Sequence, residues 1–333
     1  DKLRSVGVQV YVFEEQKTVS LELFIRLRKV LRTWRPDVVH THRQKENILA
    51  SLANRSCNNV PSVRTVHGAG EHLGAPGVRG ARQRALTRLD RWCGRALQQR
   101  IIAVTWELGG RLSRDFPAER IVVIENGVDF EALDQQRGVA EFRLAEPDAI
   151  HIGIAGRLVA VKRVDIFLEV ASLLRQKDSG RKWRFHVFGD GPLSPDLEAQ
   201  AHGLRLDNSV IFHGHRDDIA TCLAGLDALV MCSDHEGMPM LALEAAALGV
   251  PTVAHAVGGL LEVVPSEFQV TRHEPLGYRD GVERALCADG QSIAERHAAA
   301  IRARFSAQHN AKRVRELYEL VLVERQREHT SNR

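Results

Sequence analysis

Short runs of apolar, mostly β-branched residues recur along the chain, separated by longer segments in which apolar positions follow a helical spacing. The runs lie at residues 8–13, 38–40, 62–66, 101–104, 121–124, 150–155, 185–188, 210–212, 228–232 and 252–254. Runs of this length fit buried strands, and strands that alternate with helices form parallel sheets covered by helices. The pattern therefore predicts the α/β class.

One polar segment divides this series into two halves. Residues 134–148 show neither apolar period, and they end in Glu146-Pro147-Asp148. We predict a linker there, between an N-terminal domain at 1–133 and a C-terminal domain at 149–307. Beyond the last strand, one face of a helical spacing is apolar and consists of Val314, Leu317, Tyr318, Val321 and Leu322. This face predicts a packed C-terminal helix over 308–328.

Composition narrows the class of protein without naming a function. The 333 residues are 44% hydrophobic and 26% charged, which is typical of a folded globular protein. Five scattered cysteines without a CxxC pair favour a reducing cytoplasm and argue against a zinc site. No apolar run is long enough to cross a bilayer. The formal charge of +4 is mild, and we expect no nucleic-acid partner.

The segment from Asp234 to Pro251 places two carboxylates at a predicted helix. Pro239 suits the first helical position, so Glu236 lies in the preceding loop, where free N–H groups favour a bound phosphate. Glu244 lies inside the helix among alanines and leucines, and a buried carboxylate needs a hydrogen-bonding partner. That partner is either an arginine in an internal ion pair or the hydroxyls of a ligand diol such as a ribose.

Two cations follow the first strand of the C-terminal half. Arg157 and Lys162 lie on the loop that begins at Gly156. There they could neutralise a diphosphate leaving group without a metal ion. Basic loop residues are more often simply solvated, so this cluster alone assigns no function.

Together, these clusters and their order resemble family 4 of the retaining glycosyltransferases. The family pattern is a Gly-Arg-Leu loop with a following Lys, then a Val-x-Gly-x-Gly turn, then two Glu separated by seven residues. The matching residues are Gly156-Arg157-Leu158 with Lys162, Val187-Phe188-Gly189-Asp190-Gly191, and Glu236 with Glu244. Two further family motifs match Asn126-Gly127-Val128-Asp129 and Thr65-Val66-His67-Gly68. The resemblance covers nearly the whole chain and implies the GT-B fold, in which two Rossmann-like domains face a cleft.

The resemblance assigns a role to each matching residue. Arg157 and Lys162 would contact the donor diphosphate, Glu244 the ribose, and Glu236 the hydroxyls of the transferred sugar. His67 would face the reacting centre from the other domain, which makes His67 and Glu236 the catalytic candidates. Backbone groups would approach sugar and phosphate from Gly237, Met238, Pro239 and Met240. His40 and His42, at the end of the preceding strand, are candidates for the acceptor side.

The resemblance also implies the chemistry. A sugar would move from a nucleoside-diphosphate sugar to a hydroxyl of a glycan or lipid-linked acceptor, with retention at the anomeric carbon and without a metal or cofactor. The leaving phosphate would take the acceptor proton, so Glu236 would position the sugar rather than attack it. The expected role is biosynthesis of cell-surface polysaccharide or glycolipid. Residues 1–40 do not show the opening strand and Gly-rich loop of the family, so we expect an incomplete N-terminal sheet.

Two other functions suit an α/β chain. A nicotinamide-dependent oxidoreductase needs Gly-x-Gly-x-x-Gly after a first strand, and no strand end here has that loop. A catalytically silent, glycosyltransferase-like binding subunit stays open as the alternative. The intact Arg157, Lys162, Glu236 and Glu244 argue against such a decayed site.

An arginine stripe suggests a further partner. Arg84, Arg88, Arg91 and Arg95 fall on one side of a predicted helix, and the opposite side holds Leu86, Leu89, Cys93 and Leu97. We expect the apolar side to pack on the N-terminal domain and the arginines to face an anionic membrane, at the inner face of the cell membrane. The alternative is a solvated helix without a partner.

Overall fold

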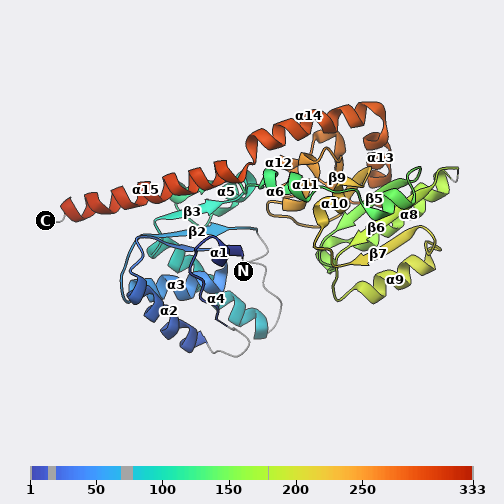
Figure 1. The fold of residues 1–333 in the computed structure, drawn as a ribbon. Helices are drawn as coiled ribbons and strands as arrows, with labels where there is room; N and C mark the ends of the chain where they lie inside the picture. Colours follow the sequence, from blue (N-terminus) through green and yellow to red (C-terminus); the bar gives the residue numbers. More distant parts are fainter. Residues whose placement is uncertain (1, 14–19, 69–77, 179, 332–333) are drawn as a thin grey trace. The chain divides into compact units, whose positions relative to one another are not determined.

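The computed structural model describes residues 2–13, 20–68, 78–178 and 180–331. The chain forms two compact units, each with its own parallel sheet. Unit 1 comprises residues 1–103, 109–123 and 315–333, and unit 2 comprises 104–108 and 124–314. Both units are of the predicted α/β class (Figure 1). Among the described residues, no helix combines the length and the apolar character needed to span a bilayer.

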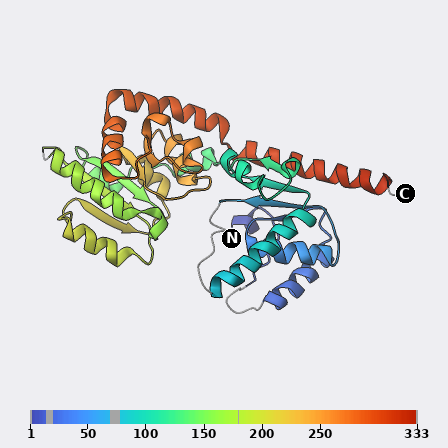
Figure 2. The same ribbon diagram turned by 180° about the vertical axis from the view of Figure 1, so that it is seen from behind.

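Unit 1 is built on four parallel strands in the order β1-β2-β3-β4. The strands are β1 (Val39–Thr41), β2 (Ser62–Val66), β3 (Arg100–Ala103) and β4 (Ile121–Val123). Its helices are α1 (Lys2–Ser5), α2 (Ser20–Trp34), α3 (Gln44–Arg55), α4 (Val78–Ala96), part of α5 (Trp106–Leu112) and the last part of α15 (Ala307–Ser331). Figure 1 and Figure 2 both show α2, α3 and α4 on the same side of this sheet.

The prediction of a strand at residues 8–13 was wrong. Residues 8–13 form no regular element, and Val8 and Val12 are 47% and 72% exposed. A β-branched run becomes a strand only beside a neighbour that accepts its backbone hydrogen bonds, and among the described residues β1 pairs with β2 alone. Tyr11 packs edge-on against Trp34 instead, and its hydroxyl accepts a hydrogen bond of 2.8 Å from the indole N–H.

A buried ion pair fixes α4 in unit 1. Asp90 of α4 accepts a hydrogen bond of 2.8 Å from Arg64 of β2, and both side chains are fully buried. Asn47 of α3 donates to the other carboxylate oxygen over 2.7 Å. The inward face of α4 is therefore centred on Asp90 and Cys93, and the prediction that Leu86 and Leu89 face the domain was wrong, since each is 37% exposed.

Unit 2 is built on six parallel strands in the order β10-β9-β8-β5-β6-β7. The strands are β5 (Ile150–Ala155), β6 (Trp183–Phe188), β7 (Val210–Gly214), β8 (Ala228–Met231), β9 (Thr252–His255) and β10 (Gln269–Val270). The helices are α6 (Phe130–Gln136), α7 (Glu141–Ala145), α8 (Val164–Lys177), α9 (Ser194–Gly203), α10 (Ile219–Ala224), α11 (Met240–Ala247), α12 (Leu260–Val263), α13 (Pro275–Leu286) and α14 (Ala288–Arg304). Phe167, Phe185 and Val187 are fully buried in its core.

The segment predicted as a linker is structured and belongs to unit 2. Residues 134–148 contain the end of α6 and all of α7. Arg143 of α7 donates to the Gly225 carbonyl and pairs with Asp227 at 2.7 Å, which ties the segment to the strand that follows. The Asn-Gly-Val-Asp motif also serves this unit, because Val128 pairs with Ser306 and Asp129 caps α6.

Candidate active site

The loops after β5, β6, β7 and β8 meet at the carboxyl ends of these strands of unit 2. β5 pairs with β6 on one side and with β8 on the other, so the strand order reverses at β5. Ligands of open α/β sheets bind outside the carboxyl ends of the strands at such a switch point. Arg157 and Lys162 follow β5, and Glu236 follows β8, so the topology brings these predicted residues to one edge.

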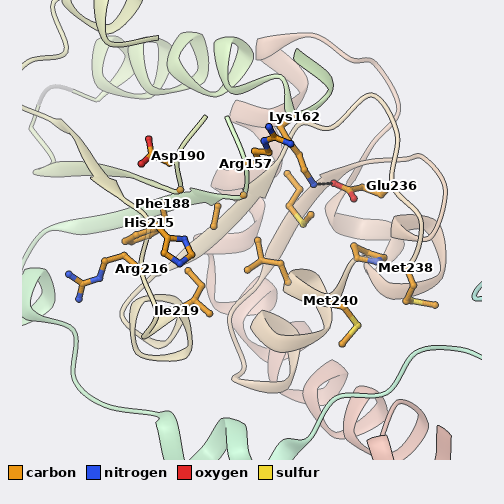
Figure 3. A pocket seen from close by; sticks show the side chains of 16 residues that line it. Arg157, Lys162, Phe188, Asp190, His215, Arg216, Ile219, Glu236, Met238 and Met240 are labelled. Atoms are coloured by element: carbon orange, nitrogen blue, oxygen red, sulfur yellow. Dashed lines mark hydrogen bonds and ion pairs between the residues drawn. The ribbon is translucent and has the colours of Figure 1, made fainter. Parts of the chain in front are cut away.

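A cavity of about 610 Å³ lies at this edge (Figure 3). The volume is within the range of small-molecule sites. The predicted residues that line it are Arg157, Lys162, Glu236, Met238, Pro239 and Met240. Gly237 and Glu244 were predicted for the same site but do not line this cavity.

Lys162 and Glu236 form an ion pair across the cavity wall. Lys162 Nζ lies 2.5 Å from Glu236 Oε1, as the dashed line in Figure 3 marks. Ser233 donates its hydroxyl proton to the same oxygen over 2.6 Å. The glutamate side chain is only 12% exposed, so it is held in one orientation by two donors. Arg157 is exposed at the wall beside this pair.

Glycines allow the loops to touch through their backbones. Gly189 has φ +125°, and a Cβ there would lie 2.0 Å from the carbonyl oxygen of Gly156. Gly258, after β9, has φ +51°, and a Cβ there would lie 2.0 Å from the carbonyl oxygen of Glu236. No other residue type fits either position without moving the neighbouring loop. Gly189 explains the Val-x-Gly-x-Gly turn, whereas Gly258 was not identified from the sequence.

Glu244 lies in α11 with its carboxylate unpaired. The side chain is half-buried, and burial raises the pKa of its carboxyl. Within the described part of the chain, no group forms a hydrogen bond or ion pair with this carboxylate. The internal ion pair considered as one interpretation of Glu244 is therefore not formed. Pro239 was predicted as the first helical residue, but it is the N-cap of α11, which begins one residue later at Met240.

The far end of the cavity holds residues that sequence reasoning missed. His215, Arg216 and Ile219 follow β7, and Figure 3 shows them away from Glu236. Arg216 is fixed by two hydrogen bonds of 2.7 Å to Asp218. Their only signal in the sequence is their place after a predicted strand.

The predicted histidines of unit 1 form a cluster of their own. His42 Nδ1 lies 3.0 Å from His67 Nε2, and His40 is hydrogen-bonded to Thr65 at 2.7 Å and to Tyr318 at 2.6 Å. In the contact between His42 and His67 the accepting nitrogen must lack a proton, so these two rings cannot both be charged. Burial, followed by repulsion from His42 and His67, lowers the pKa of His40 to about 4.

No cluster suited to a metal is found in the described ranges. Within them, no group of three or more His, Cys, Asp or Glu side chains is arranged to hold a metal ion.

Comparisons with known proteins agree on one family. Residues 149–302 match the model "Glycosyl transferases group 1", and residues 1–132 match "Glycosyltransferase Family 4". A glycogen synthase of Mycobacterium tuberculosis is 30% identical over 301 residues, which cover 85% of this chain and 68% of the relative. The UDP-Gal:alpha-D-GlcNAc-diphosphoundecaprenol alpha-1,3-galactosyltransferase of Escherichia coli is 26% identical, and the match covers 75% of this chain and 65% of the relative. The chain thus spans about two thirds of the length of these relatives.

Solved structures agree on the fold. Anabaena Alr3699/HepE in complex with UDP has a TM-score of 0.81 at 20% identity, over 96% of this chain and 88% of that one. The same protein in complex with UDP-glucose matches equally well. Neither comparison supports the nicotinamide-dependent oxidoreductase considered above. The chain belongs to family 4 of the glycosyltransferases, which use nucleotide sugars and have the GT-B fold.

Proposed function

We propose that this protein transfers a sugar from a nucleoside-diphosphate sugar to an acceptor hydroxyl, with retention at the anomeric carbon and without a metal ion. One observation carries the proposal: the cavity of unit 2 gathers Arg157, Lys162, Glu236 and the start of α11 at a topological switch point. Anabaena Alr3699/HepE, which shares the fold, was solved with UDP and with UDP-glucose.

Charge develops on the leaving diphosphate as the bond to the sugar breaks. Arg157 and Lys162 would oppose that charge, and the free N–H groups at the start of α11 would add to the effect. Interactions that strengthen as charge develops stabilise the transition state more than the ground state. The Lys162–Glu236 ion pair must then loosen, so that the ammonium meets phosphate and the carboxylate meets sugar hydroxyls.

Glu244 would accept hydrogen bonds from the ribose of the donor. Its carboxylate has no partner among the described residues, and its pKa is raised by burial, as expected for an acceptor that awaits a ligand. His67 would reach the reacting centre from unit 1, with His40 and His42 on the acceptor side. The leaving phosphate would take the acceptor proton, because the other carboxylate of the cavity lining, Asp190, lies away from Glu236 (Figure 3).

The acceptor would be a glycan or lipid-linked glycan in the biosynthesis of cell-surface polysaccharide or glycolipid. The Escherichia coli relative named above carries a lipid diphosphate acceptor in its name, which supports this class. A catalytically silent subunit is the competing function. Turnover of a nucleotide sugar by this chain would exclude that alternative.

A binding screen tests the donor assignment. UDP, GDP, ADP and their glucose or mannose derivatives are titrated into the protein by calorimetry, with EDTA throughout. We expect saturable binding of at least one nucleotide and its sugar. Binding that requires added magnesium or manganese would contradict the metal-free site, and binding of none would contradict the whole proposal.

We also propose that α4 contacts an anionic membrane surface such as the inner face of the cell membrane. Arg84, Arg88 and Arg95 of α4 are exposed, and so are Leu89 and Trp92 of the same helix, by 37% and 50%. Arginines beside exposed aromatic and aliphatic side chains suit the interface of an anionic leaflet. Arg91 is half-buried and pairs with the carboxylate of Asp115 at 3.0 Å, so we expect it to contribute less. Arg95 donates to the Asp115 carbonyl over 2.6 Å but remains exposed.

Vesicle co-sedimentation tests this surface. Arg84→Gln, Arg88→Gln and Arg95→Gln combined should abolish salt-sensitive binding to vesicles containing phosphatidylglycerol, because each arginine contributes about 1 kcal/mol near an anionic leaflet. Arg91→Gln alone is the matched control on the same helix. Binding that is absent in the wild type, insensitive to salt, or unchanged in the triple variant would show that α4 is a solvated helix.

A further inference from the structure

Arg163 directly follows the proposed diphosphate ligand Lys162 and has an unusual backbone conformation. Its φ and ψ are 48° and 45°, in the left-handed region, where it caps the start of α8. Residues with a Cβ adopt this conformation at a cost, and such outliers persist where the surroundings hold them. The contacts of the Arg163 side chain show what keeps its backbone in this conformation.

The guanidinium of Arg163 bridges two carboxylates. Its Nε and Nη2 donate to Asp165 over 3.1 and 2.9 Å, and its Nη1 donates to Asp234 over 3.3 Å. Asp165 lies on the same helix, whereas Asp234 lies on the loop that carries Glu236. Arg163 therefore joins the loop after β5 to the loop after β8.

Asp234 is anchored from the other side as well. The Oδ1 atom that meets Arg163 lies 3.0 Å from His273 Nε2, and His273 Nδ1 lies 2.8 Å from the hydroxyl of the fully buried Tyr278. His255 stacks on His273 with ring centroids 3.9 Å apart. The Asp234 N–H also donates to the Val161 carbonyl over 2.9 Å. A single exposed ion pair contributes little to the stability of a loop, but the Asp234 carboxylate belongs to a network of contacts.

The two loops are thus joined twice by side chains, through Lys162–Glu236 and through Arg163–Asp234. In the proposed function the first pair separates when the donor binds. Neither Arg163 nor Asp234 lines the cavity, so the second pair is not in competition with the donor.

We infer that Arg163 is a positioning residue, which keeps the Glu236 loop at its distance from the Lys162 loop after the donor has separated Lys162 from Glu236. The inference rests on the proposed function, because it assumes that Lys162 and Glu236 both turn to a nucleotide sugar. It concerns the placing of the transferred sugar more than the binding of the nucleotide.

Glycine is the informative substitution. Arg163→Gly removes the guanidinium, and glycine adopts the observed φ and ψ without strain, so the fold should persist. Arg205 provides a matched control, because it has φ 58°, is exposed and lies at the end of α9, outside the cavity lining. Arg205→Gly makes the same chemical change at a position that also has a positive φ.

The readouts separate positioning from binding and folding. UDP binding is measured by calorimetry, and turnover by release of glucose from UDP-glucose to water, or from whichever nucleotide sugar the wild type turns over fastest. We expect Arg163→Gly to lower kcat about tenfold or more while the Kd of the nucleoside diphosphate changes less than about twofold. Asp234→Ala should lower kcat to the same extent as Arg163→Gly. The double variant should have a kcat no lower than that of either single variant.

The outcomes distinguish this inference from the function on which it rests. Arg163→Gly that turns over like the wild type and like Arg205→Gly would overturn the positioning role alone. A lower melting temperature together with a lower nucleotide affinity would show that Arg163 has only a structural role. Additive losses of kcat in the double variant would show that Arg163 does not act through Asp234. A wild type that binds none of the nucleotides would overturn the proposed function, and this inference with it.

Discussion

Arg157, Lys162 and Glu244 serve different parts of the donor in the proposed function, so substitutions should separate them. Glu244→Ala should weaken nucleoside and nucleoside diphosphate alike by about tenfold or more, because a hydrogen bond to a charged group contributes roughly 1.5–3 kcal/mol. Arg157→Ala and Lys162→Ala should weaken the diphosphate and spare the bare nucleoside. Calorimetric titration of each variant with uridine and UDP measures both. Equal losses for the two ligands in the basic-residue variants would contradict these roles.

For single residues, the sequence predicted which side chains belong to the site better than it predicted the contacts that hold them. The spacings within 156–162 and 236–244 identified the candidate residues. Of these, Arg157, Lys162 and Glu236 line one cavity. It could not predict the left-handed backbone of Arg163 or the approach of Gly258 to Glu236, because both depend on loops far apart in the chain. Contacts of this kind leave no local period in a sequence.

Among the elements, α4 depends on one buried ion pair. Asp90→Ala would leave Arg64 buried without its carboxylate, and breaking a buried pair in this way costs about 3–5 kcal/mol. Urea unfolding should show that loss. Asp90→Ala combined with Arg64→Met should recover a large part of it, since no charge is then left in the core. Equal stability of Asp90→Ala and the wild type would show that the pair is dispensable.

Strands β5, β6 and β7 carry a chain of hydrogen-bonded histidines. His151 Nε2 lies 2.9 Å from the Glu146 carbonyl, His151 Nδ1 lies 2.8 Å from His186 Nε2, and His186 Nδ1 lies 2.9 Å from His213 Nε2. Because the carbonyl can only accept, His151 donates from Nε2, and each contact between two rings needs one nitrogen without a proton. Burial lowers the pKa of each ring, so near pH 7 the chain is neutral, with His186 donating to His151 and His213 donating to His186.

This chain predicts a loss of stability in acid. Burial is the largest cause that lowers the pKa of all three imidazoles, and that of His186 falls to about 3. The unfolded chain, with histidine pKa values near their usual 6.5, binds more protons, so stability is full above that pH and falls below it. His186 alone should account for about 2 kcal/mol between pH 7 and pH 5.

Urea unfolding at the two pH values measures this loss, and His186→Leu should reduce the difference between them. A free energy of unfolding that does not change from pH 7 to pH 5 would contradict the neutral chain.

Nine of the ten strands in the described part of the chain were predicted, because buried parallel strands are short apolar runs bounded by turns. β10, with two residues, is too short to produce such a run. The apolar run at residues 8–13 forms no strand, because the pattern of a run cannot show whether a neighbouring strand is present to pair with it.

For the whole molecule, the proposed function requires that one chain both binds a nucleotide sugar and breaks its glycosidic bond with retention. The unit 2 cavity supplies cations and a positioned carboxylate, and, among its lining residues, Glu236 and Asp190 are the acidic side chains. Asp190 lies after β6 on the Val-x-Gly-x-Gly turn. Figure 3 shows Asp190 away from Glu236, so this arrangement suits departure of a diphosphate better than chemistry that needs two adjacent carboxylates.

The stereochemistry of turnover is the most direct test. The protein is incubated in EDTA with UDP-glucose or the nucleotide sugar that it binds best, and proton NMR follows the anomeric signals of the sugar released to water before mutarotation. We predict that an α-linked donor first yields the α-anomer, at a rate that Lys162→Ala lowers about tenfold or more. A β-anomer formed first, or turnover only after addition of a divalent metal, would contradict the account.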